Sequence, residues 1–227
     1  MSTASEWNIQ QKALKELIGK KDTFDKAKDL YLSMHRYLHF SDNDNTLMDQ
    51  LWKMLDKKDF SIMPTTKDVT IAWNIWHITR IEDLTVNILL NCSEQIYNKK
   101  WQKKMKISVT DTGNAMTDDE IMYLSKNIDI EALKEYRKAV GTQTQLIFSK
   151  LQFEDMKRKV ESKDIERILN EGGVINHPDS IWLLDFWGRK NVAGIILMPG
   201  TRHQIGHIND CYNLKSIIGR KKDYYKS

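Results

Sequence analysis

The chain has 227 residues, with 35 lysines and arginines against 31 aspartates and glutamates, so its formal net charge is +4 at pH 7. This small surplus does not require a nucleic acid as a partner, and we expect none. Hydrophobic residues make up 41% and charged residues 29%, which excludes an intrinsically disordered chain. Only 3 prolines and 10 glycines are present, too few turn-forming residues for a barrel or sandwich of many short strands.

The length fits one large domain, and we treat residues 1–227 as a single unit. Cys92 and Cys211 are the only cysteines and lie far apart, so no disulfide framework is expected. The N-terminus lacks the basic and apolar regions of a signal peptide. The most apolar run, 192–199, is far shorter than the roughly 18 residues of a membrane helix. We therefore expect a cytoplasmic protein without a membrane partner.

Helical periodicity dominates the first half of the chain. Leu30, Met34 and Leu38 recur at the three- and four-residue spacing of one buried helix face. Further along, apolar residues from Val69 to Leu89 surround most of the girth of a helix, which is typical of a helix at the centre of a bundle. These patterns predict helices over 24–40, 46–57 and 65–98.

Capping signals mark helix starts in the second half. Thr117 and Glu120 have the spacing of a capping box, and Asp129 and Ser180 are further candidate N-caps. Pro199 suits the first turn of a last helix, because the missing N–H of a proline has no helical partner there, so we expect a break at Pro199. The predicted helices cover 118–126, 129–151, 154–169, 180–189, a short piece from 192, and 200–218.

Together these segments predict an all-α chain. Its four longest helices can form a four-helix bundle, with additional short connecting helices between them. The core of this bundle would cover residues 24–218, whereas residues 1–20 and 219–227 are expected to be peripheral.

The histidines carry the strongest functional signal. His35/His39 and His203/His207 each have i, i+4 spacing, which leaves two rings about 40° apart and one turn along a helix, so both can reach one ion. His77 lies in the most apolar helix, where an imidazole needs a polar partner: a metal ion, a backbone carbonyl or a water. Two histidines from one helix and one from another would leave a coordination position open for water or substrate.

Two motifs resemble the DinB-like (DinB/YfiT) superfamily of metal-binding four-helix bundles. They are the segment WHITRIE at Trp76–Glu82 and the segment RHQIGHI at Arg202–Ile208. The family holds its metal with one histidine from the second long helix and a His-x-x-x-His pair from the last. By motif position, the resemblance implies that the metal ligands are His77, His203 and His207.

The resemblance also covers the order of helices over most of the chain, although residues 1–20 and the helix at 154–169 have no counterpart in the family pattern. It implies a divalent ion, most often Zn²⁺ or Ni²⁺, and a homodimer. It further implies a small-molecule substrate, in some members a low-molecular-weight thiol such as bacillithiol, mycothiol or glutathione.

Helical geometry places other side chains around His77. Asn74 and Arg80 lie about 60° from it, so both are candidates for contact with a bound ligand or cofactor, Arg80 through a carboxylate or phosphate. The alternative for Arg80 is an ion pair with an acidic side chain on the surface. Glu82 lies about 140° from His77, which favours a structural hydrogen bond to a neighbouring helix or loop over metal ligation.

The remaining candidates have simpler interpretations. His35 and His39 are expected on the polar shoulder of an amphipathic helix, with an auxiliary metal contact as the alternative. Cys211 follows the last histidine pair and is interpreted as a small buried hydrophobe rather than a ligand. Gly206 would allow a facing helix to approach closely. His177 precedes a proline in a loop, where its position suggests no function.

These observations leave two main hypotheses for function. The first is a metal-dependent enzyme, a transferase or a hydrolase, in which the metal would carry the chemistry because no serine or cysteine nucleophile set is evident. That the transferase would be a thiol-dependent S-transferase is implied by the resemblance alone. The second is a metal-binding, stress-associated protein without turnover. Nucleic-acid binding is a third hypothesis, but no known binding motif supports it.

Overall fold

Helices make up the described part of the chain. The computed structural model describes residues 4–43 and 45–224, and no strand occurs in these ranges. The nearest approach to a sheet is an isolated antiparallel bridge between Lys159 and Asn191. The prediction of an all-α chain is therefore confirmed. The predicted peripheral ends lie partly outside the described residues, at 1–3 and 225–227.

The N-terminal half contains five α-helices, two 3-10 turns and one π-helical segment within the described residues. The α-helices are α1 (Ala4–Leu17), α2 (Phe24–Tyr37), α3 (Leu47–Lys53), α4 (Ile71–Glu82) and α5 (Lys99–Met105). The 3-10 turns are η1 (Lys21–Thr23) and η2 (Lys57–Ser61), and the π-helical segment η3 (Asp83–Leu90) continues α4.

The C-terminal half begins with the capped helices that were predicted. Thr117 and Glu120 form the capping box of α6, and the Asp129 side chain caps α7. The α-helices are α6 (Asp118–Asn127), α7 (Ile130–Lys150), α8 (Ser162–Asn170), α9 (Pro178–Gly188), α10 (Val192–Leu197) and α11 (His203–Tyr224). A 3-10 turn, η4 (Phe153–Lys157), precedes α8, and a π-helical turn, η5 (Met198–Arg202), joins α10 to α11.

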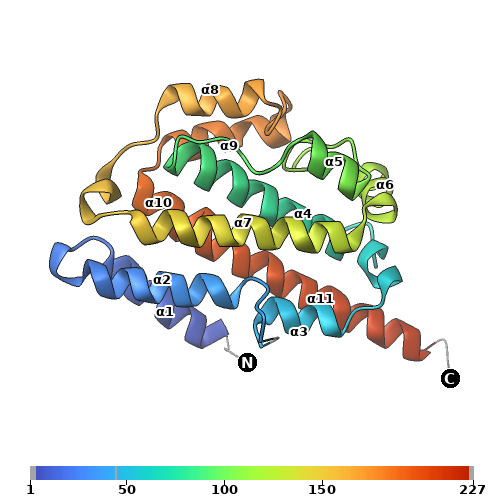
Figure 1. The fold of residues 1–227 in the computed structure, drawn as a ribbon. Coiled ribbons are helices and arrows are strands. Elements are labelled where there is room, and N and C mark those ends of the chain that lie inside the picture. Colours follow the sequence, from blue (N-terminus) through green and yellow to red (C-terminus); the bar gives the residue numbers. More distant parts are fainter. Residues whose placement is uncertain (1–3, 44, 225–227) are drawn as a thin grey trace.

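Helix α4 forms the centre of the molecule. Every residue from Ile71 to Glu82 is buried, and so is every residue of η3. Helix α4 packs against α11, α7 and α6, while α2 packs against α7 and α1. Figure 1 shows α1 and α2 along one edge, α8 along the opposite edge, and α4, α7 and α11 between them. The apolar residues around the whole circumference of α4 are thus covered by other helices on several sides, as its sequence pattern requires.

Two predicted helices are shorter than expected. The helix predicted over 65–98 begins at Ile71, because the Thr70 side chain caps it by accepting a hydrogen bond from the backbone N–H of Trp73. It ends with η3 before Cys92, which has a left-handed φ of 51°. The helix predicted over 154–169 is divided between η4 and α8, because the intervening backbone pairs with residues 190–192 instead.

The N-terminal segment forms a helix that the sequence patterns did not predict. Trp7, Leu14 and Ile18 at or just beyond α1 are all buried, and α1 packs against α2 and α10. The Gln11 side chain donates a hydrogen bond of 2.8 Å to the carbonyl of Leu197. This part of the segment predicted to be peripheral therefore contributes to the core.

The chain continues through Pro199 without the expected break. Instead, η5 forms a π-helical turn immediately before the last histidine pair. Pro199, which has no backbone N–H to donate, lies in the first residues of this turn. The buried Thr201 hydroxyl donates hydrogen bonds to the backbone carbonyls of Ile196 and Leu197. A π-helical turn changes the angular register of the residues that follow it, so η5 helps to set which face of α11 presents the histidines.

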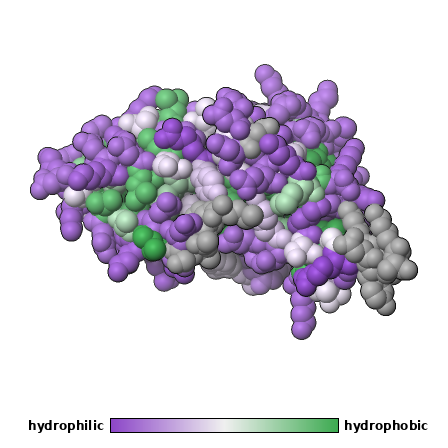
Figure 2. All heavy atoms as spheres, turned by 90° about the horizontal axis from the view of Figure 1, so that it is seen from below, coloured by the Kyte–Doolittle hydropathy of each residue, from purple (hydrophilic) through white to green (hydrophobic). Residues whose placement is uncertain are grey.

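Hydrophilic residues cover most of the face seen in Figure 2, where hydrophobic side chains form only small separate groups. Among the helices of residues 4–43 and 45–224, none combines the length and apolar character that are needed to span a bilayer.

Candidate metal centre

Three histidines that lie far apart in the sequence meet between α4 and α11. His77 comes from α4, and His203 and His207 come from the first turns of α11. One ligand atom from each of these residues lies within 4.8 Å of the other two. The ring centroids are 5.1 Å apart for His77 and His203, 4.8 Å for His77 and His207, and 4.6 Å for His203 and His207. We call these three residues the histidine triad.

The loop 106–117 holds His77 from outside the helix. His77 Nδ1 lies 2.8 Å from the carbonyl oxygen of Thr112, which can only accept, so Nδ1 carries the proton and Nε2 presents a lone pair. Trp73 stacks on the His77 ring at 4.6 Å with an interplanar angle of 9°, and its Nε1 donates to the carbonyl of Gly113. Loop and tryptophan together fix the ring and its tautomer.

Asn74 fixes the tautomer of His207 in the same way. Its Nδ2 donates to the carbonyl of Thr70 at 3.1 Å, which orients the amide so that Oδ1 faces His207. His207 Nδ1 lies 2.7 Å from this Oδ1 and therefore carries the proton. The lone pair of His207 is then on Nε2. Asn74, which we expected to contact a bound ligand, instead contacts a member of the triad.

His203 brings the third nitrogen to the same place. Its Nε2 lies 3.2 Å from Nε2 of His77, and its Nδ1 is buried without a hydrogen-bond partner. Two nitrogens that bind one tetrahedral metal ion with bonds of about 2.0–2.1 Å lie about 3.3 Å apart. The separation of the two rings is therefore close to that of two ligands of one ion.

Burial keeps the triad in the form that binds metal. Burial, followed by the charge of neighbouring histidines, lowers the pKa of His77 to about 3 and that of His203 to about 2. Burial also lowers the pKa of His207 from its ordinary value. Neutral imidazoles are the ligating form, so no deprotonation of His77 or His203 would accompany metal binding at pH 7.

Solvent reaches the triad from the His207 side. The side chain of His207 is 23% exposed, whereas His77 is only 3% exposed. A ligand bound to an ion at this site would therefore approach past His207. Asp210 also lies on this side, 3.9 Å from His207 Nδ1, and its side chain is mostly exposed.

Arg80 lies in a separate hydrogen-bond network. Its Nε donates to the carbonyl of Thr110, Nη1 donates to Asp83 and Tyr136, and Nη2 donates to Gln95 and Thr110. All five N–H groups of the guanidinium are thus engaged. The structure does not bring Arg80 to the triad as a ligand contact. Arg80 forms an ion pair instead, but its partner Asp83 is buried, not the surface acid of the alternative prediction.

A second group of polar residues lies in the core beside the triad. His35 Nε2 donates to Glu82 Oε1 at 2.7 Å, and His39 Nε2 lies 3.0 Å from Glu82 Oε2. The expected surface position of His35 and His39 is therefore wrong, because both rings face inward from α2 to reach the buried carboxylate, with 0% and 2% exposure. Glu82 makes the structural hydrogen bond to a neighbouring helix that we predicted.

Three further residues singled out in the sequence do not belong to the histidine triad. Cys211 is buried among apolar side chains, and burial raises the pKa of its thiol. Gly206 faces open space rather than a closely packed helix, so the expected close approach there is wrong. His177 caps α9 by accepting the backbone N–H of Asp179, a structural role that we had assigned to Ser180.

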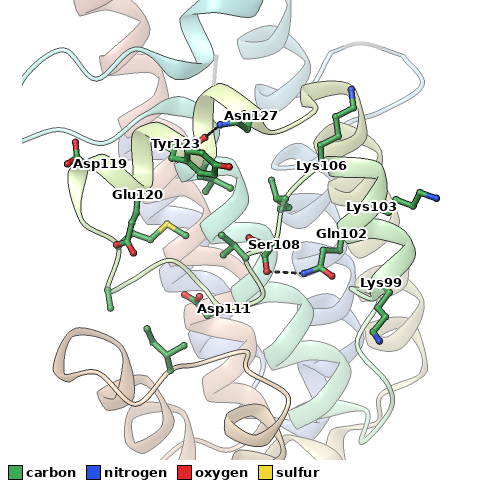
Figure 3. A pocket seen from close by; sticks show the side chains of 16 residues that line it. Lys99, Gln102, Lys103, Lys106, Ser108, Asp111, Asp119, Glu120, Tyr123 and Asn127 are labelled. Carbon is green, nitrogen blue, oxygen red and sulfur yellow. Dashed lines mark hydrogen bonds between the residues drawn. The ribbon is translucent and has the colours of Figure 1, made fainter.

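A cavity of about 980 Å³ is lined by other residues. It opens between α5 and α6 (Figure 3). No histidine is among its lining residues in the described chain. Asp111 and Met116 line it from loop 106–117, the loop whose Thr112 carbonyl holds His77. The side chains labelled around it are Lys99, Gln102, Lys103, Lys106, Ser108, Asp111, Asp119, Glu120, Tyr123 and Asn127.

Sequence reasoning missed the residues that support the triad from other elements. Thr112 acts through a backbone carbonyl, which no side-chain pattern reveals. Gln204 and Arg137 lie in the core beside Glu82, although both side chains are of types that are usually exposed. The only signal for Gln204 was its position inside the His-x-x-x-His motif.

The chain matches no protein-family model and no curated protein. The resemblance to the DinB-like superfamily therefore stays a prediction from the two sequence motifs.

Proposed function

We propose that this chain is a DinB-like, divalent-metal-dependent protein in which His77, His203 and His207 hold the ion. The observation that carries the proposal is the meeting of three neutral imidazoles from α4 and α11, two of them with tautomers set by protein acceptors. Without a cation, Nε2 of His77 has only Nε2 of His203 as a polar neighbour, 3.2 Å away. A metal ion between the rings would be a partner for the lone pairs of all three.

The donor set suits Zn²⁺ or Ni²⁺, because imidazole is a borderline ligand that binds both strongly. Outer hydrogen bonds of the kind made by Thr112 and Asn74 are the usual partners of metal-bound histidines, and they raise the basicity of the ligating nitrogen. Three protein ligands also leave a coordination position for an exogenous group, as in catalytic rather than structural sites.

A bound ion would supply Lewis acidity to an oxygen or sulfur atom at its open position. The residues of the chain would prepare that position. Trp73 covers one face of His77 and excludes water from it, while the partial exposure of His207 leaves a route for a small molecule. The resemblance suggests that this molecule is a low-molecular-weight thiol, which makes an S-transferase the favoured enzyme class, with a hydrolase as the other.

Metal content tests the site. Protein purified without an affinity tag should carry one Zn²⁺ or Ni²⁺ per chain, measured by elemental analysis. The His203→Ala/His207→Ala variant should lose this metal and keep its helical circular dichroism, because both side chains are partly exposed rather than core residues. The control is His177→Ala, which removes an exposed histidine far from the triad in the sequence. Equal metal content in all three proteins would refute the proposal.

A thiol-consumption assay separates the enzyme from the alternative, a metal-binding protein without turnover. The metal-loaded protein is mixed with a thiol and an electrophile, and loss of free thiol is followed. Faster loss with the wild type than with the double variant supports the transferase. Equal rates, together with confirmed metal binding, would favour the alternative.

A further inference from the structure

Glu82 is the centre of a buried polar network that joins α2, α4, α7 and α11. Besides His35 and His39, its carboxylate accepts a hydrogen bond of 3.0 Å from Nε2 of Gln204, the residue that follows His203. Arg137 on α7 donates to Oε1 of Gln204 at 3.0 Å. We call these five residues the Glu82 network. All of them are at most 2% exposed.

The orientation of each polar group in the Glu82 network is determined by its partners. Because the Arg137 guanidinium can only donate, it fixes the carbonyl oxygen of the Gln204 amide on its own side. The Gln204 NH₂ group therefore faces Glu82, and it also lies 3.2 Å from the carbonyl of Ile78. Gln204 thus spans from α11 to the backbone and side chains of α4, the helix that carries His77.

The charges of the Glu82 network balance without a metal ion. Burial would raise the pKa of Glu82, but the neighbouring His39 and His35 hold it well below its usual range. Burial lowers the pKa of Arg137 to about 10, so at pH 7 one carboxylate and one guanidinium are ionised. A divalent ion added here would leave two uncompensated positive charges in a fully buried site, which is strongly unfavourable, whereas the triad is open to solvent at His207 and has the Asp210 carboxylate nearby.

The two histidine groups also differ in which nitrogen is engaged. In the triad, Nδ1 of His77 and His207 is bonded to the protein and Nε2 is left for an ion. In the Glu82 network, Nε2 of His35 is hydrogen-bonded to the carboxylate and Nε2 of His39 lies 3.0 Å from it without a well-aligned hydrogen bond, and both Nδ1 atoms are buried without a partner. Although His35, His39 and Glu82 are close enough to hold an ion, their nitrogens are arranged as donors to an anion.

We infer that the Glu82 network binds no metal and instead fixes the rotation of α11 relative to α4, with Gln204 as a positioning residue for the histidine triad. The inference rests on the proposed function, because it assigns Gln204 a role in metal affinity. Gln204 lies between the two triad residues of α11 in the sequence, so a rotation of this helix that breaks the Gln204–Glu82 hydrogen bond also moves both imidazoles away from His77.

The test is a titration of metal-free protein with Co²⁺, followed by visible absorption, which reports both affinity and coordination geometry. Gln204→Met keeps the length of the side chain but removes its hydrogen bonds. We expect Co²⁺ binding about 10–100-fold weaker than in the wild type, the range for loss of outer-sphere support, with an altered spectrum. We expect one Co²⁺ per chain in the wild type.

Thr85→Val is the matched control, because Thr85 is equally buried, lies in η3 outside both α11 and the Glu82 network, and loses only its hydroxyl bonds to the backbone carbonyls of Ile81 and Glu82. It should bind Co²⁺ like the wild type, even if both variants lose similar thermal stability. Should Gln204→Met fail to fold, Glu82→Gln tests the same link, because it removes the anion at an almost unchanged volume and should also weaken Co²⁺ binding.

Three results would overturn the inference in distinguishable ways. Unchanged affinity and spectrum in a folded Gln204→Met protein would remove the positioning role and leave the metal site intact. Binding of two Co²⁺ per chain, one of them lost in His39→Ala, would make the Glu82 network a metal site. Binding of no Co²⁺ by the wild type would refute the proposed function itself, and the inference with it.

Discussion

The role of a buried histidine depends on which of its two nitrogens is already bonded. His77 and His207 have Nδ1 engaged by Thr112 and Asn74, so each leaves Nε2 for a metal ion. His35 has Nε2 engaged by Glu82, and its Nδ1 is buried without a hydrogen-bond partner. The same residue type therefore has two different surroundings in one core, and the acceptor beside each ring decides which nitrogen is left with a lone pair.

Asn74 offers a direct test at the scale of a single residue. Replacing it with leucine removes the acceptor that holds the proton on Nδ1 of His207, so the ring can rotate or change tautomer. We expect Asn74→Leu to bind Zn²⁺ about 10–100-fold more weakly than the wild type, measured by competition with a chromophoric chelator. Asn74→Asp keeps an oxygen at this position and should retain more affinity than Asn74→Leu. Equal affinities in the leucine variant and the wild type would contradict the assignment.

Among the helices, glycines distinguish close packing from open surface. Gly141 lies in the middle of α7 where the His39 ring packs against the helix, and an added Cβ would lie 2.4 Å from His39 Nδ1. Gly206 lies in α11, and a Cβ there would meet nothing within 4 Å. Glycine inside a helix costs up to about 1 kcal/mol relative to alanine, so only Gly141 has a packing reason to be kept.

Alanine at these two positions should therefore shift stability in opposite directions. We expect Gly206→Ala to raise the free energy of unfolding by about 0.5–1 kcal/mol through better helix propensity. Gly141→Ala should lower it by about 1–3 kcal/mol, because the new methyl group must displace a buried ring. Urea unfolding of the two variants beside the wild type measures both changes. Stabilisation by both substitutions would show that His39 does not pack on Gly141.

The observed helix boundaries show which features of a helix can be predicted from its own sequence and which cannot. The starts of α6 and α7 were predicted because their caps are local, made by Thr117 and Asp129 within their own first turns. The interruption between η4 and α8 was not predicted, because its cause is backbone pairing with residues 190–192, about thirty positions away. Helix caps can be predicted from neighbouring residues in the sequence, whereas backbone pairing between distant segments cannot.

On the scale of the whole molecule, buried ionisable groups make stability depend on pH. Burial lowers the pKa of His39 from 6.5 to about 3 in the folded protein. Between these values the unfolded chain binds a proton at this histidine and the folded chain does not, so stability must fall as pH decreases from 6.5 towards 3. Glu82, whose pKa is lowered by folding, adds a loss in the same direction below its ordinary value of 4.5.

We therefore expect the urea midpoint of metal-free protein to be lower at pH 5 than at pH 7. A chelator in both samples prevents metal release from contributing to the difference. His39→Gln removes one titrating group and should reduce the dependence on pH, although His77 and His203, which are also buried and neutral, still contribute. A midpoint that is unchanged or higher at pH 5 would contradict this account of the core.

The amino-acid sequence by itself determined the all-α class, several helix starts and the pairing of His203 with His207, because each depends on residues within a few turns of one another. It also indicated that His77 needed a polar partner, since an imidazole in so apolar a helix cannot remain without one. The helix formed by residues 4–17 was not predicted, because its burial depends on contacts with α2 and α10 rather than on the hydrophobic pattern of its own sequence.

Only the tertiary structure shows what each histidine pair contacts. The pairs at 35/39 and 203/207 have the same spacing, and only the motif resemblance favoured 203/207 as the partners of His77. Their surroundings come from other helices and loops: the carbonyl of Thr112 and the amide of Asn74 for the triad, and the carboxylate of Glu82 for the other pair. Proton positions and ligand geometry are properties of contacts between distant segments, and those contacts exist only once the helices have packed.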